Sequence, residues 1–307
     1  MASEARSAPH LKVLDDLLSL GRAVLAEIEY SKPDEGLHAW VFALLARLTS
    51  SGLAARALIR AGHTWDAKII GRAMLDSLID MAYILHDPSK RAHLIELFRL
   101  ESIVDQHSIL TFHAALQHKS PRQLARTDTR AQQIIHNYRQ ALKHPAFQSR
   151  GPKVPKGRKP QWPRRWKDIG RNEKQKALEE YADAMRLMQF PVRELGNAAA
   201  HARPVVLEEL LQKRPDGSSH FLVRPRARSS LLFSRDVLAL EACTVLHIAY
   251  EYVIRQFRLS AALEGRAQEL FAHLERLSLR AKRCVSRPSV GSTAQSPSPT
   301  PARHSWR

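Results

Sequence analysis

The sequence predicts an all-α protein: a multi-helix bundle with a basic loop insertion and a disordered C-terminal tail. Apolar residues recur at spacings of three and four along most of the chain, which is the pattern of amphipathic helices. The segment 147–171 instead gathers Pro, Gly, Lys and Arg, a composition typical of a loop or linker. After Ser286 the chain is mainly Ser, Pro and Thr, which bury too little apolar surface to become ordered.

The N-terminal helical half is expected to cover 11–146, after a disordered segment 1–10. Thr64 is expected to cap the third helix, because its hydroxyl can accept a hydrogen bond from the first turn. Asp87-Pro88 should end that helix, because proline disfavours helical geometry in the residue before it. We expect helices at 11–30, 37–61 (bent at Ser50-Ser51-Gly52), 64–86, 89–118 and 121–144.

The C-terminal helical half is expected to cover 172–283. Arg214-Pro215-Asp216-Gly217 has the residues of a tight turn, and the alternation at 220–223 predicts one short strand after it. The tail 284–307 should be disordered. The predicted helices are 173–188, 192–201, 234–263 and 265–282.

The positive charge is concentrated in two segments. The chain carries a net charge of +18, of which 150–176 holds +9 and 276–307 holds +7. The rest of the chain is therefore nearly neutral. A basic segment of this kind attracts polyanions more strongly than the same charge spread over the surface.

The basic loop is the candidate nucleic-acid interface. Cations neutralise phosphates, and aromatic rings can stack on unpaired bases. The alternative is a solvated loop whose tryptophans fold back onto the bundle. The candidate contact residues are Lys153, Lys156, Arg158, Lys159, Trp162, Arg164, Arg165, Trp166, Lys167 and Arg171.

One predicted helix carries a polar stripe. Arg72, Asp76 and Asp80 recur every four residues, which places them on one face, turn above turn. One interpretation is a polar site inside the bundle. The other is a ladder of surface ion pairs, each contributing only a few tenths of a kcal/mol.

Two blocks of the sequence resemble the domain of unknown function family 5677. The first is the helix Gly71 to Leu85 with its Asp87-Pro88 ending, and the second runs from Trp166 to Pro204. The second block of that family typically ends in a serine, two residues and then His-Pro. His201 matches, whereas Ala198 stands where the serine would be. The resemblance covers about 35–260 and implies a helical fold without a settled activity.

The stretch from Asn197 to His201 also resembles the second half of the motif of HEPN nucleases, Arg-Asn-x-x-x-His. In that chemistry a histidine moves a proton while an arginine stabilises the negative charge on phosphate. Gly196 stands in the place of the arginine. The likeness implies His201 and Asn197 as candidate catalytic residues, and Arg72, Asp76 and Asp80 are candidates if they meet His201 in one cleft.

The sequence lacks the motifs of several other functional classes. There is no Gly-rich phosphate loop and no His-Glu-x-x-His, and the two cysteines form no zinc pattern. We expect no metal and no cofactor. No uninterrupted apolar run has the length that spans a bilayer, so we expect a cytoplasmic protein without a membrane partner.

These observations leave three functions open, and whether the protein is an enzyme stays undecided. The first is a nucleic-acid binding protein, with RNA as partner, that has a degenerate HEPN-like site. The alternative is a non-catalytic helical interaction or scaffold protein that forms a homodimer and whose polar stripe is structural. The third is a metal-free hydrolase built on Asp76 and Asp80.

Overall fold

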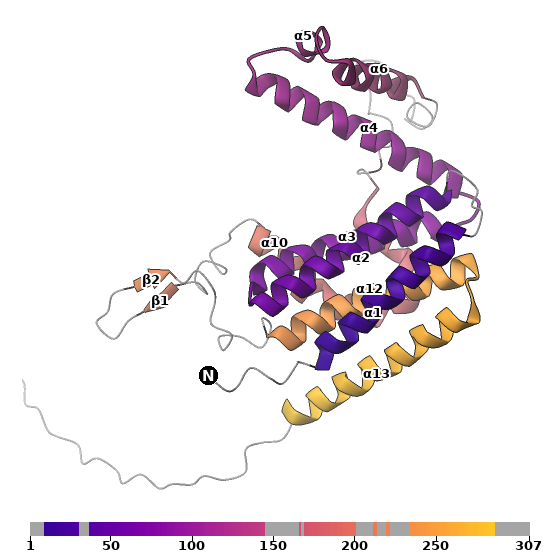
Figure 1. Cartoon of the computed structure of the whole chain (residues 1–307), viewed down its shortest axis with the longest axis vertical. Helices are drawn as coiled ribbons and strands as arrows, with labels where there is room; N and C mark the ends of the chain where they lie inside the picture. Colours follow the sequence, from indigo (N-terminus) through magenta and orange to yellow (C-terminus); the bar gives the residue numbers. More distant parts are fainter. Residues whose placement is uncertain are drawn as a thin grey trace, which may run out of the picture.

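Five long helices form the main bundle of this computed structural model (Figure 1). They are α1 Pro9–Tyr30, α2 Leu37–Ala61, α3 Thr64–His86, α12 Arg235–Phe257 and α13 Ala261–Val285. The structure describes residues 9–30, 37–144, 166, 169–200, 211–213, 219–221 and 234–285. Within these residues the bundle shares one apolar core, to which α3 and α12 contribute the most buried side chains. The predicted all-α fold is therefore confirmed.

A helical hairpin extends from one end of the bundle (Figure 1). α4 Arg91–Leu116 leaves the bundle, and α5 Pro121–Ala125 and α6 Thr129–Lys143 turn back along it. A small apolar cluster of Leu100, Val104 and Ala141, with Ile103 and Tyr138 beside it, joins α4 to α6. The base of α4 thus belongs to the bundle, and its far end is supported by α6.

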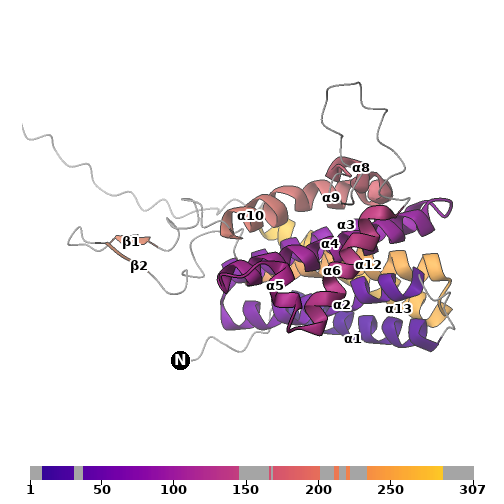
Figure 2. The same ribbon diagram turned by 90° about the horizontal axis from the view of Figure 1, so that it is seen from above.

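A chain of short helices covers one face of α3 (Figure 2). α8 Arg171–Gln175 continues through the 3-10 turn Lys176–Tyr181 into α9 Ala182–Met188, and the π-helical segment Gln189–Glu194 leads into α10 Leu195–Ala200. This layer positions the candidate site, because it lies over the polar stripe of α3.

A two-stranded antiparallel hairpin lies apart from the helices. β1 Leu211–Lys213 pairs with β2 Ser219–Phe221, with Leu211 opposite Phe221. The predicted strand at 220–223 thus begins one residue earlier, at Ser219, and has a partner that the sequence did not indicate. The predicted turn at 214–217 lies outside the described residues.

Several predicted helix boundaries were wrong. Thr64 does not cap α3: the cap position is His63, without a side-chain hydrogen bond, because the chain turns one residue earlier at Gly62, whose φ is +81°. The single helix expected at 121–144 is two helices, since the side chain of Asp128 caps a new start at α6. The helix expected at 173–188 changes to 3-10 geometry, with a kink at Leu178.

Two helices have the length and composition of membrane spans: Ala39–Ala61 within α2, and Arg235–Phe257, which is α12. The sequence expectation considered uninterrupted apolar runs, and it did not detect these helices because each contains a few polar residues. In α12, 72% of the apolar window is buried inside the bundle. Burial in a protein core is sufficient to explain why this helix is apolar.

Candidate functional site

The polar stripe of α3 faces α8. Arg171 donates from Nη1 to Asp76 Oδ1 at 2.8 Å, and Lys174 donates from Nζ to Asp80 Oδ1 at 2.8 Å. Arg72 Nε lies 3.7 Å from Asp76 Oδ2. The cations are three residues apart on α8 and the carboxylates four apart on α3, so each helix presents its pair from successive turns. The stripe therefore forms the polar contact between two helices, rather than an isolated ladder on one helix.

Arg72 on α3 and Arg171 on α8 flank Asp76, and Arg193, just before α10, lies near Arg171. We call these three residues the arginine cluster. Burial lowers the pKa of Arg171, the charges of Arg193 and Arg72 lower it further, and Asp76 acts in the opposite direction. Arg193 has its own acidic neighbour, Glu194, with 3.7 Å between Nε and Oε1. Within the part of the chain that the structure describes, the three guanidinium groups therefore have only two carboxylates as neighbours, those of Asp76 and Glu194.

The arginine cluster has more hydrogen-bond donors than acceptors. Arg171 Nε and Nη2 are buried and have no hydrogen-bond partner among the described residues, and the same holds for Arg72 Nε. Leaving a buried donor unpaired costs about 1–3 kcal/mol, and more for a charged group. An oxyanion such as phosphate would supply the missing acceptors, and the planar guanidinium suits that geometry.

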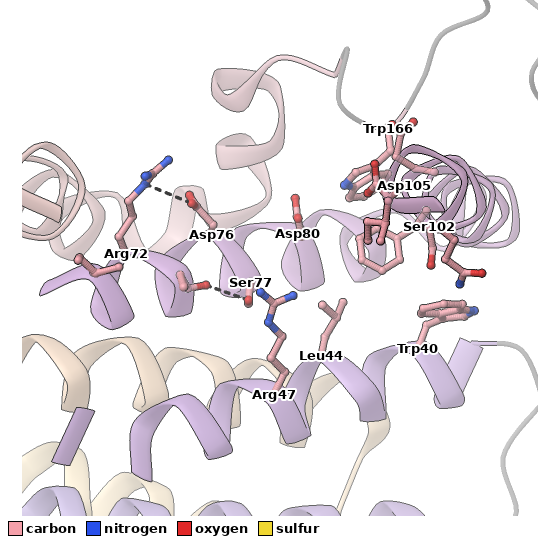
Figure 3. Close-up of a pocket in the computed structure, with 16 residues that line it drawn as sticks. Trp40, Leu44, Arg47, Arg72, Asp76, Ser77, Asp80, Ser102, Asp105 and Trp166 are labelled. Carbon is pink, nitrogen blue, oxygen red and sulfur yellow. Dashed lines mark hydrogen bonds and ion pairs between the residues drawn. The ribbon is translucent and has the colours of Figure 1, made fainter. Parts of the chain in front are cut away.

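A pocket of about 770 Å³ opens beside the stripe, between α2, α3 and α4 (Figure 3). This volume is in the range of small-molecule sites. Its polar lining residues are Arg47, Arg72, Asp76, Ser77, Asp80, Glu101, Ser102, Asp105 and Gln106, and its apolar ones are Trp40, Leu44, Ile69, Ala73, Phe98, Ile109 and Trp166.

One end of the pocket is aromatic. Phe98 packs edge-on against both Trp40 and Trp166, with ring centroids 5.5 and 5.1 Å away. Tyr83 packs against Trp166 from outside the pocket, at 5.9 Å. Lys174 Nζ lies 4.1 Å from the Trp166 ring centroid. The same lysine that pairs with Asp80 thus also holds Trp166 in place, which links the aromatic end to the polar stripe.

The structure describes two of the ten residues predicted for the nucleic-acid interface. Trp166 is 5% exposed and folds back onto the bundle, so its ring forms part of the pocket wall. Arg171 belongs to the arginine cluster. The eight others lie outside the described residues: Lys153, Lys156, Arg158, Lys159, Trp162, Arg164, Arg165 and Lys167.

The second sequence block comes close to the first at α10. A Cβ atom on Gly196 would lie 2.8 Å from Arg72 Cβ and 2.9 Å from the carbonyl oxygen of Lys68. Glycine allows α10 to approach α3 this closely, and the arginine of the HEPN motif would not fit there. Asn197 is half-buried on α10, and His201 follows the helix directly but lies outside the described residues.

Sequence reasoning missed the cationic partners of the stripe and much of the pocket. Arg47, Asp105 and Lys174 come from three different elements, so no spacing in the sequence connects them. It also missed a buried ion pair, in which Lys68 Nζ donates to both carboxylate oxygens of Glu241 at 2.5 and 2.7 Å. The only signal for that pair was a lysine within an otherwise apolar helix face.

The arrangement of the acidic side chains shows whether they could hold a metal ion and whether Asp76 and Asp80 could form a hydrolase site. Among the residues that the structure describes, no group of three or more His, Cys, Asp or Glu side chains is arranged to hold a metal ion. Asp76 and Asp80 each accept a hydrogen bond from a cationic side chain. Both carboxylates are thus engaged in ion pairs between α3 and α8, so the arrangement gives the hydrolase hypothesis no support.

A comparison with models of known protein families shows which family the chain belongs to. The model of a family of unknown function, DUF5677, matches residues 38–218. The chain belongs to this family. The match ends well before position 260, so it is shorter than the sequence resemblance suggested. All residues lining the pocket and all three arginines of the cluster lie inside the DUF5677 region.

No curated protein and no solved structure matches the chain.

Proposed function

We propose that this DUF5677 protein binds nucleic acid, with RNA as the partner, and that backbone phosphates occupy the arginine cluster. The observation that carries the proposal is the unmet donors of Arg171 and Arg72. Phosphate oxygens are strong acceptors for guanidinium groups, and a polyanion would also balance the excess charge of the cluster.

The distribution of charge supports a polymer rather than an isolated anion. The segment 150–176 carries +9, and Arg171 lies within it. The basic segment is therefore covalently joined to the arginine cluster through the start of α8. A strand held at the cluster would have further cations beside it along the chain, and each phosphate that they neutralise adds affinity by releasing counterions.

The test is the affinity for a single-stranded RNA of roughly 12 nucleotides, a length within the range bound by single-strand binding domains. We expect binding at low salt that weakens steeply as salt rises. Arg171→Gln should weaken it about tenfold or more, because a charge-assisted contact contributes about 1.5–3 kcal/mol. Fluorescence anisotropy measures both effects.

Arg186→Gln is the matched control, because Arg186 is 76% exposed and pairs with Asp183 away from the arginine cluster. It should leave the affinity nearly unchanged. If no RNA binds at low salt, or if both variants lose the same affinity, the proposal is wrong.

We place a degenerate HEPN-like reaction second. Its support is that α10, the helix that precedes His201 in the sequence, packs against Arg72. Cleavage of RNA should then be abolished by His201→Ala. Unchanged cleavage in that variant would remove His201 from the reaction.

A non-catalytic interaction protein is the alternative. Its support is an exposed apolar stripe on α4, formed by Ile109, Phe112 and Leu116, which are 61–64% exposed. Residues spaced by three and four lie on one helix face, so the stripe is continuous. If this stripe joins two copies, light scattering should show a dimer in the unmodified protein and a monomer after Phe112→Ser. A monomer in both cases would reject the dimer.

A further inference from the structure

The pocket beside the arginine cluster has two chemically different ends, and the labelled side chains in Figure 3 show them. Arg72 and Asp76 lie at one end, on α3. Trp40, Trp166 and Asp105 lie at the other, where α4 crosses α2. The pocket continues along α3 from Arg72 to Asp80, about 12 Å at the helical rise of 1.5 Å per residue. It therefore runs from Arg72, the arginine of the cluster that lines it, to an aromatic compartment.

The aromatic compartment carries hydrogen-bonding groups along one side. Ser102, Asp105 and Gln106 line it from the same stretch of α4. Within the described part of the chain, Asp105 has no hydrogen-bond or ion-pair partner, and its side chain is exposed. A carboxylate in this position accepts hydrogen bonds from N–H groups and donates none.

A ligand that fits both ends has an anionic group, a short linker and a flat ring with N–H donors on its edge. One face of the ring would contact the aromatic residues Trp40 and Phe98, and its edge would meet Asp105. A nucleotide has these parts in this order. Arg47 projects from α2 between the two ends and has no partner among the described residues, so it adds a cation midway (Figure 3).

We propose that this pocket receives one unstacked base of a bound single strand, whose phosphate lies at the arginine cluster. The inference rests on the proposed RNA binding and adds base recognition to it. Stacking on aromatic side chains accepts every base, whereas a carboxylate distinguishes them by their donors. Cytosine, adenine and guanine have an exocyclic amino group, and uracil has none. The pocket should therefore prefer amino-bearing bases to uracil.

The experiment compares oligo(C) with oligo(U), each of roughly 12 nucleotides, by fluorescence anisotropy. The unmodified protein should bind oligo(C) about fivefold more tightly, which corresponds to the lower limit of about 1 kcal/mol for one good base contact. Asp105→Asn should reduce this ratio, because the amide replaces one acceptor with a donor. Ser102→Trp, which fills the aromatic compartment without touching the arginine cluster, should lower the oligo(C) affinity about tenfold and leave oligo(U) less affected.

Ser108→Trp is the matched control, because it introduces the same side chain on α4 at a position that does not line the pocket. Thermal melting of each variant confirms that it is folded. If Arg171→Gln weakens binding but oligo(C) and oligo(U) bind equally and Ser102→Trp has no effect, the base pocket is wrong and RNA binding stands. If neither oligonucleotide binds the unmodified protein, both proposals are wrong.

Discussion

His247 is a buried histidine whose charge state is coupled to folding. It is 4% exposed on α12 and stacks on Phe271 of α13, with ring centroids 4.6 Å apart. Burial lowers its pKa to about 4, although a backbone hydrogen bond to Ala267 acts in the other direction. The unfolded chain has a histidine pKa near 6.5. Between these two values the unfolded state binds a proton that the folded state does not.

The protein should therefore lose stability as the pH falls from about 6.5 toward 4, and keep this contribution in full above 6.5. From pH 7 to pH 5 the expected loss from His247 is about 2 kcal/mol. Urea unfolding at the two pH values measures it. In His247→Leu the difference should shrink by that amount, and an unchanged difference would assign the pH dependence to other groups.

For single residues, the sequence predicted spatial neighbours correctly where those neighbours belong to the same helix. The spacing of Arg72, Asp76 and Asp80 predicted their common face, because helical geometry alone determines it. The partners of the two carboxylates, Arg171 and Lys174, come from α8, about a hundred residues later. Only the packing of this helix on α3 could bring the charges together.

The contact between α10 and α3 depends on the absence of a side chain at Gly196. In Gly196→Ala the new methyl group would lie within 3.0 Å of Arg72 Cβ and of the backbone oxygen of Lys68. A backbone atom cannot move aside alone, so α10 must shift. We expect a loss of about 1–3 kcal/mol, typical of overpacking, together with weaker RNA binding because Arg72 moves. Thermal unfolding and anisotropy measure the two effects.

Gly265→Ala is the control for that substitution. No atom lies within 4 Å of the Cβ position at Gly265 in α13, and the residue is inside the helix. Alanine there should stabilise the protein by about 0.5–1 kcal/mol, because it restricts the unfolded chain more than glycine does. If the two substitutions destabilise the protein equally, the close approach of α10 to α3 is wrong.

At the scale of elements, the long helices were predictable and their ends were less so. The apolar periodicity located α1, α2, α3 and α4 to within a few residues, because each buries a broad face. The helix predicted at 234–263 ends earlier, at Phe257, because Arg258 adopts a left-handed conformation that closes α12 before α13 begins. Asp128 is followed by Thr129, and nothing in the local periodicity showed that its side chain would start a new helix. Trp166 lies in a segment with loop composition, yet contacts with Tyr83 and Phe98 bury it. A local side-chain cap decided the first case, and contacts between distant segments decided the second.

The whole molecule contains more than the DUF5677 region. Residues 38–218 carry the pocket and the arginine cluster, whereas α1, α12 and α13 lie outside the match. The buried faces of α12 and α1 complete the core around α2 and α3. Lys68, inside the region, has its carboxylate partner Glu241 on α12. The matched region thus depends on helices that flank it in the sequence.

A fragment of residues 38–218 should consequently not fold by itself. Losing α12 exposes the apolar faces of α2 and α3 and leaves Lys68 buried without its carboxylate, a change that costs about 3–5 kcal/mol for a buried pair. Circular dichroism should show less helix than in the full chain and no cooperative thermal transition. A fragment that unfolds cooperatively with native helix content would show that the flanking helices are dispensable.

Phosphate and Asp76 should compete for the guanidinium groups of the arginine cluster. Affinity for single-stranded RNA, measured across a range of salt for Asp76→Asn and Arg171→Gln, tests this competition most directly. We expect Asp76→Asn to bind several-fold more tightly than the unmodified protein, because its arginines lose an internal acceptor. We expect Arg171→Gln to bind more weakly, with a salt slope shallower by about 0.7, the value for one lost phosphate contact on a single strand. If both variants weaken binding, or neither changes it, phosphate does not occupy this cluster.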